Sequence, residues 1–196
     1  MTYPITYPFG EVTEGEKPFR LALGNLIVHY VGVERMVHML FHMFSGIPQV
    51  IGQTIIGGMR FADVLNIVSR LVDLSSLTDE GKAEYVKCVE QINHISQFRH
   101  ALIHRGGFSG PEDITSSNAI TAKSPEAVEI WRFTVDDINA AARDAHALVL
   151  KLWLITSPSM AEANLLKELI DGIREPWRYK PVRPEKPNQP PRKAPR

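Results

Sequence analysis

The chain has 196 residues, of which 44% are hydrophobic, and it contains 22 Lys and Arg against 22 Asp and Glu. This length and apolar content suit one compact domain with short appendages and exclude a wholly disordered protein. Although the net charge is zero, the charged residues are unevenly distributed along the chain. From Arg178 onward there are seven basic residues and one acidic residue, a net charge of +6, whereas residues 1–177 have 15 basic and 21 acidic residues, a net charge of −6.

The sequence predicts a cytoplasmic protein that neither enters nor spans a membrane. The single cysteine, Cys88, cannot form an internal disulfide, and residues 1–17 contain acids and prolines where a signal peptide has a basic and then an apolar region. The most apolar stretch, residues 147–155, is interrupted by Lys151 and falls well short of the roughly 18 residues that a membrane span needs.

The first half of the chain predicts helices. Apolar residues recur at helical spacing over residues 19–44, and the run ends at a Ser-Gly-Ile-Pro sequence that is typical of a helix exit. Residues 49–58 mix isoleucine with glycine and indicate a short helix or a loop. Residues 60–74 have the spacing of a helix with one face in the core.

The second half predicts further helices and a small β element. Thr78 or Asp79 caps a helix over residues 80–104, which ends before two glycines. Two short segments, residues 118–122 and 128–133, suggest a hairpin within residues 117–133. Another helix begins at Thr134, and a capping box at residues 159–162 opens a last helix that ends near residue 173.

These elements predict a mainly α protein, an up-and-down helical bundle of about five helices with a small β-hairpin insertion and a disordered C-terminal tail. The expected organisation is an extended lead-in over residues 1–18, a helical domain over residues 19–175, and a Pro-rich basic tail over residues 176–196.

Prolines recur every third residue from Pro181 to Pro190, which would align them on one edge of a polyproline II helix. Arg183, Lys186 and Arg192 share the next edge, and we consider them candidate RNA-binding residues. A solvated tail and a docking strip for a protein partner are the alternatives. Trp177 and Tyr179, where the tail begins, are expected to pin it to the body or to stack on a base; a truncation after Trp177 is expected to leave the fold intact.

The densest group of reactive side chains is Arg99, His100, His104 and Arg105, at the end of the predicted helix over residues 80–104. On an ideal helix His100 and His104 lie about 40° apart, whereas Arg99 and His104 lie about 140° apart. Imidazoles can transfer protons during phosphodiester cleavage, and a guanidinium can hold the phosphate oxygens, without a metal. Arg99 and His104 can meet at one phosphate only if the helix unwinds or a second subunit contributes. The alternative is that these residues cap the helix end.

The segment from Arg99 to His104 resembles the Arg-polar-x-x-x-His signature of the HEPN (higher eukaryotes and prokaryotes nucleotide-binding) superfamily. The setting is similar too: a helical chain, the motif at the end of a long helix, and a glycine just after the histidine. The resemblance implies a four-helix bundle that often dimerises and, in active members, a metal-independent endoribonuclease that needs no cofactor and has one composite site between two protomers.

By this resemblance Arg99 would stabilise the phosphate, His104 would be the acid/base imidazole, and His100 would orient the site or contact RNA. Many members are toxins or phage-defence nucleases, so an antitoxin or another protein partner is possible. Other members are non-catalytic and bind a nucleotide, RNA or protein, which remains the alternative function for this chain.

Glu34, His38 and His42 recur every four residues and form one stripe on the predicted helix over residues 19–44. Such a stripe could hold a transition metal, but no cysteine or further carboxylate completes a ligand set, and we expect no metal. Glu34 is also a candidate supporter of the motif, because active members of the superfamily sometimes place an acidic residue on an early helix. Arg105 is the other supporting candidate, because an acidic body needs a local basic path for RNA.

Overall fold

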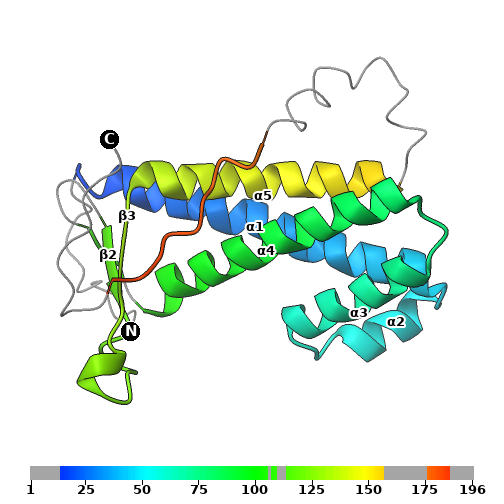
Figure 1. Cartoon of the computed structure of the whole chain (residues 1–196), viewed down its shortest axis with the longest axis horizontal. Helices are drawn as coiled ribbons and strands as arrows, with labels where there is room; N and C mark the ends of the chain where they lie inside the picture. The colour runs from blue at the N-terminus through cyan, green and yellow to red at the C-terminus, as the bar shows by residue number, and fades with distance from the viewer. Residues whose placement is uncertain (1–13, 106, 110–113, 157–175, 186–196) are drawn as a thin grey trace, which may run out of the picture.

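The computed structural model describes residues 14–105, 107–109, 114–156 and 176–185. Its architecture confirms the predicted mainly α bundle with a small β element. Helices α1 (Lys17–Ser45) and α5 (Val135–Thr156) lie side by side along the molecule, and α4 (Asp79–His104) crosses beside them (Figure 1). The shorter helices α2 (Gln49–Ile56) and α3 (Phe61–Leu74) lie at the end of the molecule opposite the β-strands.

Local sequence signals explain where the helices begin and end. The Thr78 hydroxyl accepts the Gly81 backbone N–H at 3.1 Å, which caps α4 as predicted. At the start of α5, the Asp137 carboxylate accepts the Thr134 backbone N–H at 2.7 Å and the Thr134 hydroxyl accepts the Asp137 N–H at 3.2 Å. Helix α1 ends at Gly46, whose φ of 63° is a left-handed conformation that glycine adopts without strain.

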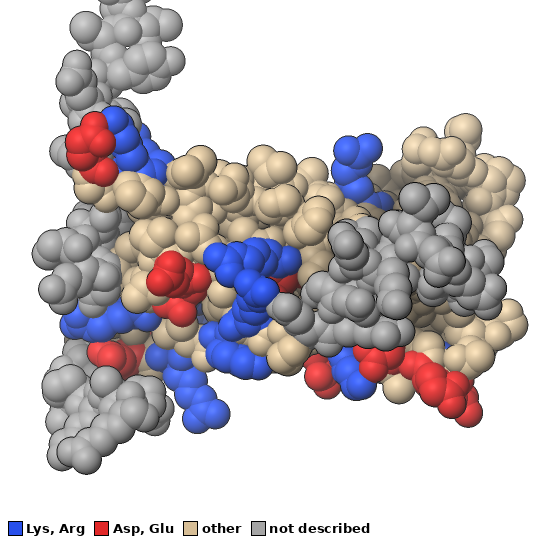
Figure 2. Space-filling model, turned by 90° about the horizontal axis from the view of Figure 1, so that it is seen from above, with Lys and Arg blue, Asp and Glu red and all other residues tan. Residues whose placement is uncertain are grey.

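The core lies where α1, α4 and α5 meet. It is built from the apolar faces that the helical spacing predicts, and its largest fully buried side chains include Leu26, Tyr30, Leu40, Ile92, Ile95, Ile138, Leu148 and Leu152. Some apolar side chains are exposed, among them Leu21, Val28 and Val31 of α1. Seen from above, the molecule shows a broad uncharged area between clusters of charged side chains (Figure 2).

The β element is a three-stranded antiparallel sheet in the order β1–β2–β3, with β1 at Gly107–Ser109, β2 at Ile114–Ser117 and β3 at Ile130–Phe133. The predicted hairpin was therefore right in kind and wrong in detail. Its expected first strand, residues 118–122, is a turn, because the Asn118 side chain accepts the Glu129 backbone N–H at 2.7 Å and donates to the Ala127 carbonyl at 3.2 Å. A 3₁₀ turn at Pro125–Ala127 completes this connection.

Residues 176–185, which we call the strap, pack against the body although the sequence assigned them to the tail. Tyr179 is 3% exposed, and its ring stacks on Phe98 at 4.7 Å between centroids. Trp177 lies under Lys151, whose ammonium is 4.3 Å from the ring centroid. Glu185 forms an antiparallel bridge with Ile130, next to β3.

The predicted pinning role of Trp177 and Tyr179 is therefore confirmed, and the folded domain extends through Glu185. A truncation after Trp177 would remove Tyr179 from the core, so we now expect it to destabilise the fold and not to leave it intact. The lead-in to residue 13, the predicted helix over residues 159–173 and tail residues 186–196 lie outside the described residues.

Candidate functional site

The two motif histidines lie together at the end of α4. The His100 and His104 rings are 4.6 Å apart between centroids, and both side chains are exposed. The helix stays regular here, because it runs through His104 and the Arg105 backbone N–H still donates to the Ala101 carbonyl at 3.2 Å. The same carbonyl accepts the buried Ser116 hydroxyl at 3.0 Å, which attaches strand β2 to this last turn. The expected shared face of the two histidines is confirmed.

Arg99 lies on a different side of α4, against α1. Its guanidinium carbon is 5.0 Å from the centroid of the Tyr30 ring, and its Nε is buried without a hydrogen-bond partner among the described residues. Because the helix does not unwind before His104, a single chain does not bring Arg99 and His104 to one phosphate.

Glu34 and Arg99 both act on Tyr30, and Glu34 is not among the groups that act on His100. Burial raises the pKa of Tyr30, the Glu34 carboxylate raises it further, and the Arg99 guanidinium lowers it. Tyr30 therefore lies close to both charges, on the side of α4 that faces α1. This is where a residue that supports Arg99 would have to be.

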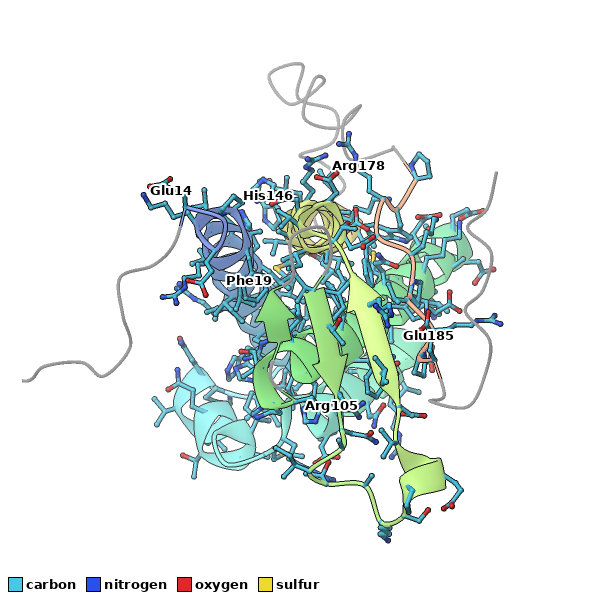
Figure 3. All side chains as sticks on the ribbon, turned by 90° about the vertical axis from the view of Figure 1, so that its left-hand side faces the viewer. Glu14, Phe19, Arg105, His146, Arg178 and Glu185 are labelled. Carbon is cyan, nitrogen blue, oxygen red and sulfur yellow. The ribbon has the colours of Figure 1, made fainter. Side chains whose placement is uncertain are left out.

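Arg105 contacts the β element. Its guanidinium carbon lies 4.0 Å from the centroid of the Trp131 ring in β3, and its Nη1 is 3.8 Å from a carboxylate oxygen of Glu129. Figure 3 shows Arg105 below the strands. Sequence reasoning missed Trp131, because nothing in the spacing of residues 99–105 connects them with an aromatic side chain 26 positions further on.

His100 and Arg105 share a pocket with Trp131, Phe133 and the strap. The pocket has a volume of about 510 Å³, and His94, Pro181 and Val182 also contribute to its wall. This volume is in the range of small-molecule sites, which are typically about 300–1,000 Å³. His104 and Arg99 are not part of its lining.

The electrostatic surroundings of His100 are cationic. Partial burial lowers the pKa of its imidazole, and His104, Arg105 and Arg99 each lower it further. A lowered pKa keeps this imidazole neutral at pH 7, so it can accept a proton. The same cations would attract the phosphate of a ligand.

Of the three predicted RNA-binding residues, the structure describes only Arg183, which is exposed on the strap. Its neighbours Val182 and Pro184 line the pocket that contains His100. Lys186 and Arg192 lie outside the described residues.

The stripe of Glu34, His38 and His42 does not converge on one site. His38 and His42 line a groove between α1 and α2, whereas Glu34 acts on Tyr30. Over residues 14–105 and the other described ranges, no group of three or more His, Cys, Asp or Glu side chains is placed to hold a metal ion. The Nδ1 of His42 is buried against Gly52, where an added Cβ would lie 2.6 Å from that nitrogen.

The fold and this region define a helical-bundle protein with an exposed histidine pair at the end of a core helix. Comparisons with protein-family models, with curated proteins and with solved structures give no match to the chain. Of the helices in the described part of the chain, none combines the length and apolar character needed to cross a lipid bilayer.

Proposed function

We propose that the protein is a HEPN-type, metal-independent endoribonuclease that acts as a homodimer. The observation that carries the proposal is the exposed His100–His104 pair at the end of α4, with two permanent cations, Arg99 and Arg105, acting on His100. A pair of imidazoles beside fixed positive charge suits proton transfer at a phosphodiester.

In the proposed site, His104 transfers the proton and His100 orients the RNA or contacts it. Arg99 holds the non-bridging phosphate oxygens, and Glu34 positions Arg99. Because Arg99 and His104 lie on different sides of α4, the site needs both protomers: Arg99 of one chain acts with the partner's His104. Arg105 and Arg183 supply positive charge along the RNA path, together with Lys186 and Arg192.

The test is cleavage of single-stranded RNA by the purified full chain in the presence of EDTA. We expect His104→Ala and Arg99→Ala to lower the cleavage rate at least about 100-fold, the lower end of what general acid–base catalysis contributes. His38→Ala is the matched control, since His38 lies on α1 and lines a different groove, and it should cleave at the wild-type rate. Equal cleavage by wild type and His104→Ala would sink the proposal.

Mixed dimers test whether the site is shared. When the Arg99→Ala and His104→Ala chains are co-expressed and the mixed dimer is purified with two different tags, each dimer holds one intact Arg99 and one intact His104. If the two protomers build one site, the mixed dimer should recover part of the activity that both homodimers lack. A site contained within one chain would show no recovery.

The biological setting is proposed on the HEPN resemblance. An RNA-cleaving protein of this kind works in the cytoplasm as a toxin or a phage-defence effector, and a toxin needs an antitoxin partner. Induced expression of the wild type, and not of His104→Ala, should therefore arrest cell growth and fragment RNA.

One observation favours the alternative, a non-catalytic domain that binds a nucleotide, RNA or protein. Arg99 packs on Tyr30 and part of its guanidinium is buried, which is how a structural arginine is held. In that case Arg99→Ala would lower the free energy of unfolding, and wild-type protein would bind RNA without cleaving it.

A further inference from the structure

A groove between α1 and α5 contains a second group of nitrogen-rich side chains. Asn25 and His29 line it from α1, and Asn139, Arg143 and His146 line it from α5. Each set recurs at three- or four-residue intervals, so each occupies one face of its helix. Figure 3 shows His146 on the side of α5 that faces α1, at the opposite side of the molecule from Arg105.

All five polar side chains can donate hydrogen bonds, and no Asp or Glu lines the groove among the described residues. The contact recorded among the five is an edge-to-face packing of the His29 and His146 rings, 5.1 Å between centroids. None of the five side chains has a hydrogen bond or an ion pair with any described residue. Asn25, Arg143 and His146 are exposed and His29 and Asn139 are half-buried, so their donor groups are open to a ligand from solvent.

We propose that this groove binds a phosphate group. A tetrahedral oxyanion offers acceptors in several directions, and the groove presents one permanent cation, Arg143, with four further donor side chains around it. The groove volume of about 300 Å³ is at the small end for ligand sites, which fits one phosphate and its ester carbon and not a dinucleotide. Arg143 also disfavours a metal cation at the histidine pair.

Because the two histidines can take up a proton, phosphate binding and histidine protonation should affect each other. Partial burial lowers the pKa of His29, and His146 lowers it further. Of the described residues that line the groove, His29 is the titratable group from α1, and Arg143 and His146 are the charged or titratable groups from α5. A bound oxyanion would stabilise the imidazolium form, so binding should raise the pKa of His29 and should strengthen as the pH falls from 7.5 to 5.5.

The first experiment follows the histidine ring signals of the full chain by NMR during titrations with sodium phosphate and with sodium sulfate. Sulfate keeps its charge over this pH range and separates protein titration from phosphate titration. The His29 and His146 signals should shift and saturate, and sodium chloride at equal ionic strength should not reproduce the shift. Unchanged signals, or the same shift with chloride, would overturn the proposal.

Variants test which side chain holds the oxyanion. Arg143→Gln should weaken binding about tenfold or more, because a charge-assisted hydrogen bond is lost. Arg70→Gln, at an exposed arginine on α3, is the matched control and should bind like the wild type. Both side chains are exposed, so both variants should fold, which circular dichroism checks. Equal binding by the Arg143→Gln and Arg70→Gln variants would count against the site.

The source of the phosphate is distinguished by competition. Adenosine 5′-monophosphate tests a small phosphate ester, and a ten-nucleotide single-stranded RNA without terminal phosphates tests the backbone phosphodiester. Displacement of sulfate by either one supports the site and identifies its ligand, and displacement by neither overturns it. The inference stands apart from the ribonuclease proposal, because His104→Ala should bind sulfate as the wild type does.

Discussion

Individual residues of the motif have different surroundings, although they are neighbours in sequence. Arg99 packs on Tyr30 of α1, Arg105 packs on Trp131 of β3, and the two histidines between them remain exposed. Fewer than two turns of helix are enough to separate these environments. Residues that are neighbours in a basic cluster of the sequence therefore have three different environments in the fold, and His100 and Arg105 share the lining of one pocket.

The pKa of His100 gives a prediction at this scale. Partial burial and the charges of His104, Arg105 and Arg99 lower it, so the folded protein binds a proton here less readily than the unfolded chain does. His100 therefore contributes to the free energy of unfolding at pH values above its usual pKa of 6.5. This contribution is lost as the pH falls through the lowered pKa of the folded protein.

NMR titration of the histidine ring signals should place the His100 midpoint below 6.5. Arg105→Gln should move that midpoint upward, because it removes one of the neighbouring charges, whereas Arg60→Gln, on a different helix end, should leave it in place. A downward shift in the Arg105→Gln variant would mean that charge is not what lowers the pKa.

At the scale of elements, one buried carboxylate accepts several hydrogen bonds that help to hold the strap. Asp144 of α5 is 4% exposed and accepts the backbone N–H groups of Arg178 at 3.1 Å and Tyr179 at 2.8 Å. Gln91 of α4 donates to the same carboxylate at 2.8 Å and to the Tyr179 carbonyl at 3.3 Å. Through these hydrogen bonds the carboxylate joins α4, α5 and the strap. Burial raises the pKa of Asp144, whereas the hydrogen bonds lower it.

Asp144→Ala should therefore release the strap. We expect the free energy of unfolding to fall by about 1–3 kcal/mol, because three donors lose their acceptor in the interior. Trypsin should also cleave the Arg178–Tyr179 bond faster, since Tyr179 is no longer fixed. Asp136→Ala is the control, at an exposed carboxylate in the first turn of α5. It should lower the free energy of unfolding by no more than about 1 kcal/mol and should not speed trypsin cleavage of the strap. Unchanged cleavage in Asp144→Ala would show that the other contacts, such as the stacking of Tyr179 on Phe98 and the bridge of Glu185 with Ile130, hold the strap without this carboxylate.

The sequence predicted the helices well because their signals are local. Helical spacing identified the buried faces of α1, α3, α4 and α5, and Thr78 and Thr134 marked two helix starts. The sheet and the strap were less predictable, because both depend on pairing between distant residues: Ile114 of β2 pairs with Phe133 of β3, Glu185 bridges to Ile130, and Tyr179 bonds to Asp144, 35 positions earlier. Propensity and spacing do not encode such contacts.

The same limit applies to the candidate site. The shared face of His100 and His104 follows from helix geometry alone, and it was predicted correctly. The contacts of Arg99 with Tyr30 and of Arg105 with Trp131 require knowledge of which helix and strand lie beside α4. The groove of His29, Arg143 and His146 was missed for that reason, since its halves are more than 100 residues apart.

At the scale of the whole molecule, the fold fixes where the first basic residues of the C-terminal segment lie. The strap carries Arg178, Lys180 and Arg183 onto the face that holds the His100 pocket, because Tyr179 and Glu185 anchor it there. The acidic body would repel RNA over much of its surface. An RNA strand that follows the strap would be led toward the histidine pair, so the proposed basic path ends at the histidine half of the proposed site, and Arg99 would come from the partner.

A homodimer that shares this site must bury the end of α4, which gives the last prediction. Ile103 lies between the two motif histidines in sequence and is 41% exposed, and an apolar side chain at this place suits a subunit contact. Ile103→Glu should weaken dimerisation about 100-fold, because a buried unpaired charge costs several kcal/mol, and RNA cleavage should be lost with it. Sedimentation velocity over a range of concentrations and the cleavage rate measure the two effects.

Ile120→Glu is the matched control: Ile120 is 99% exposed in the turn between β2 and β3, and its replacement should change neither quantity. An Ile103→Glu protein that remains dimeric and active would place the subunit contact elsewhere, and the composite site at the end of α4 would have to be abandoned.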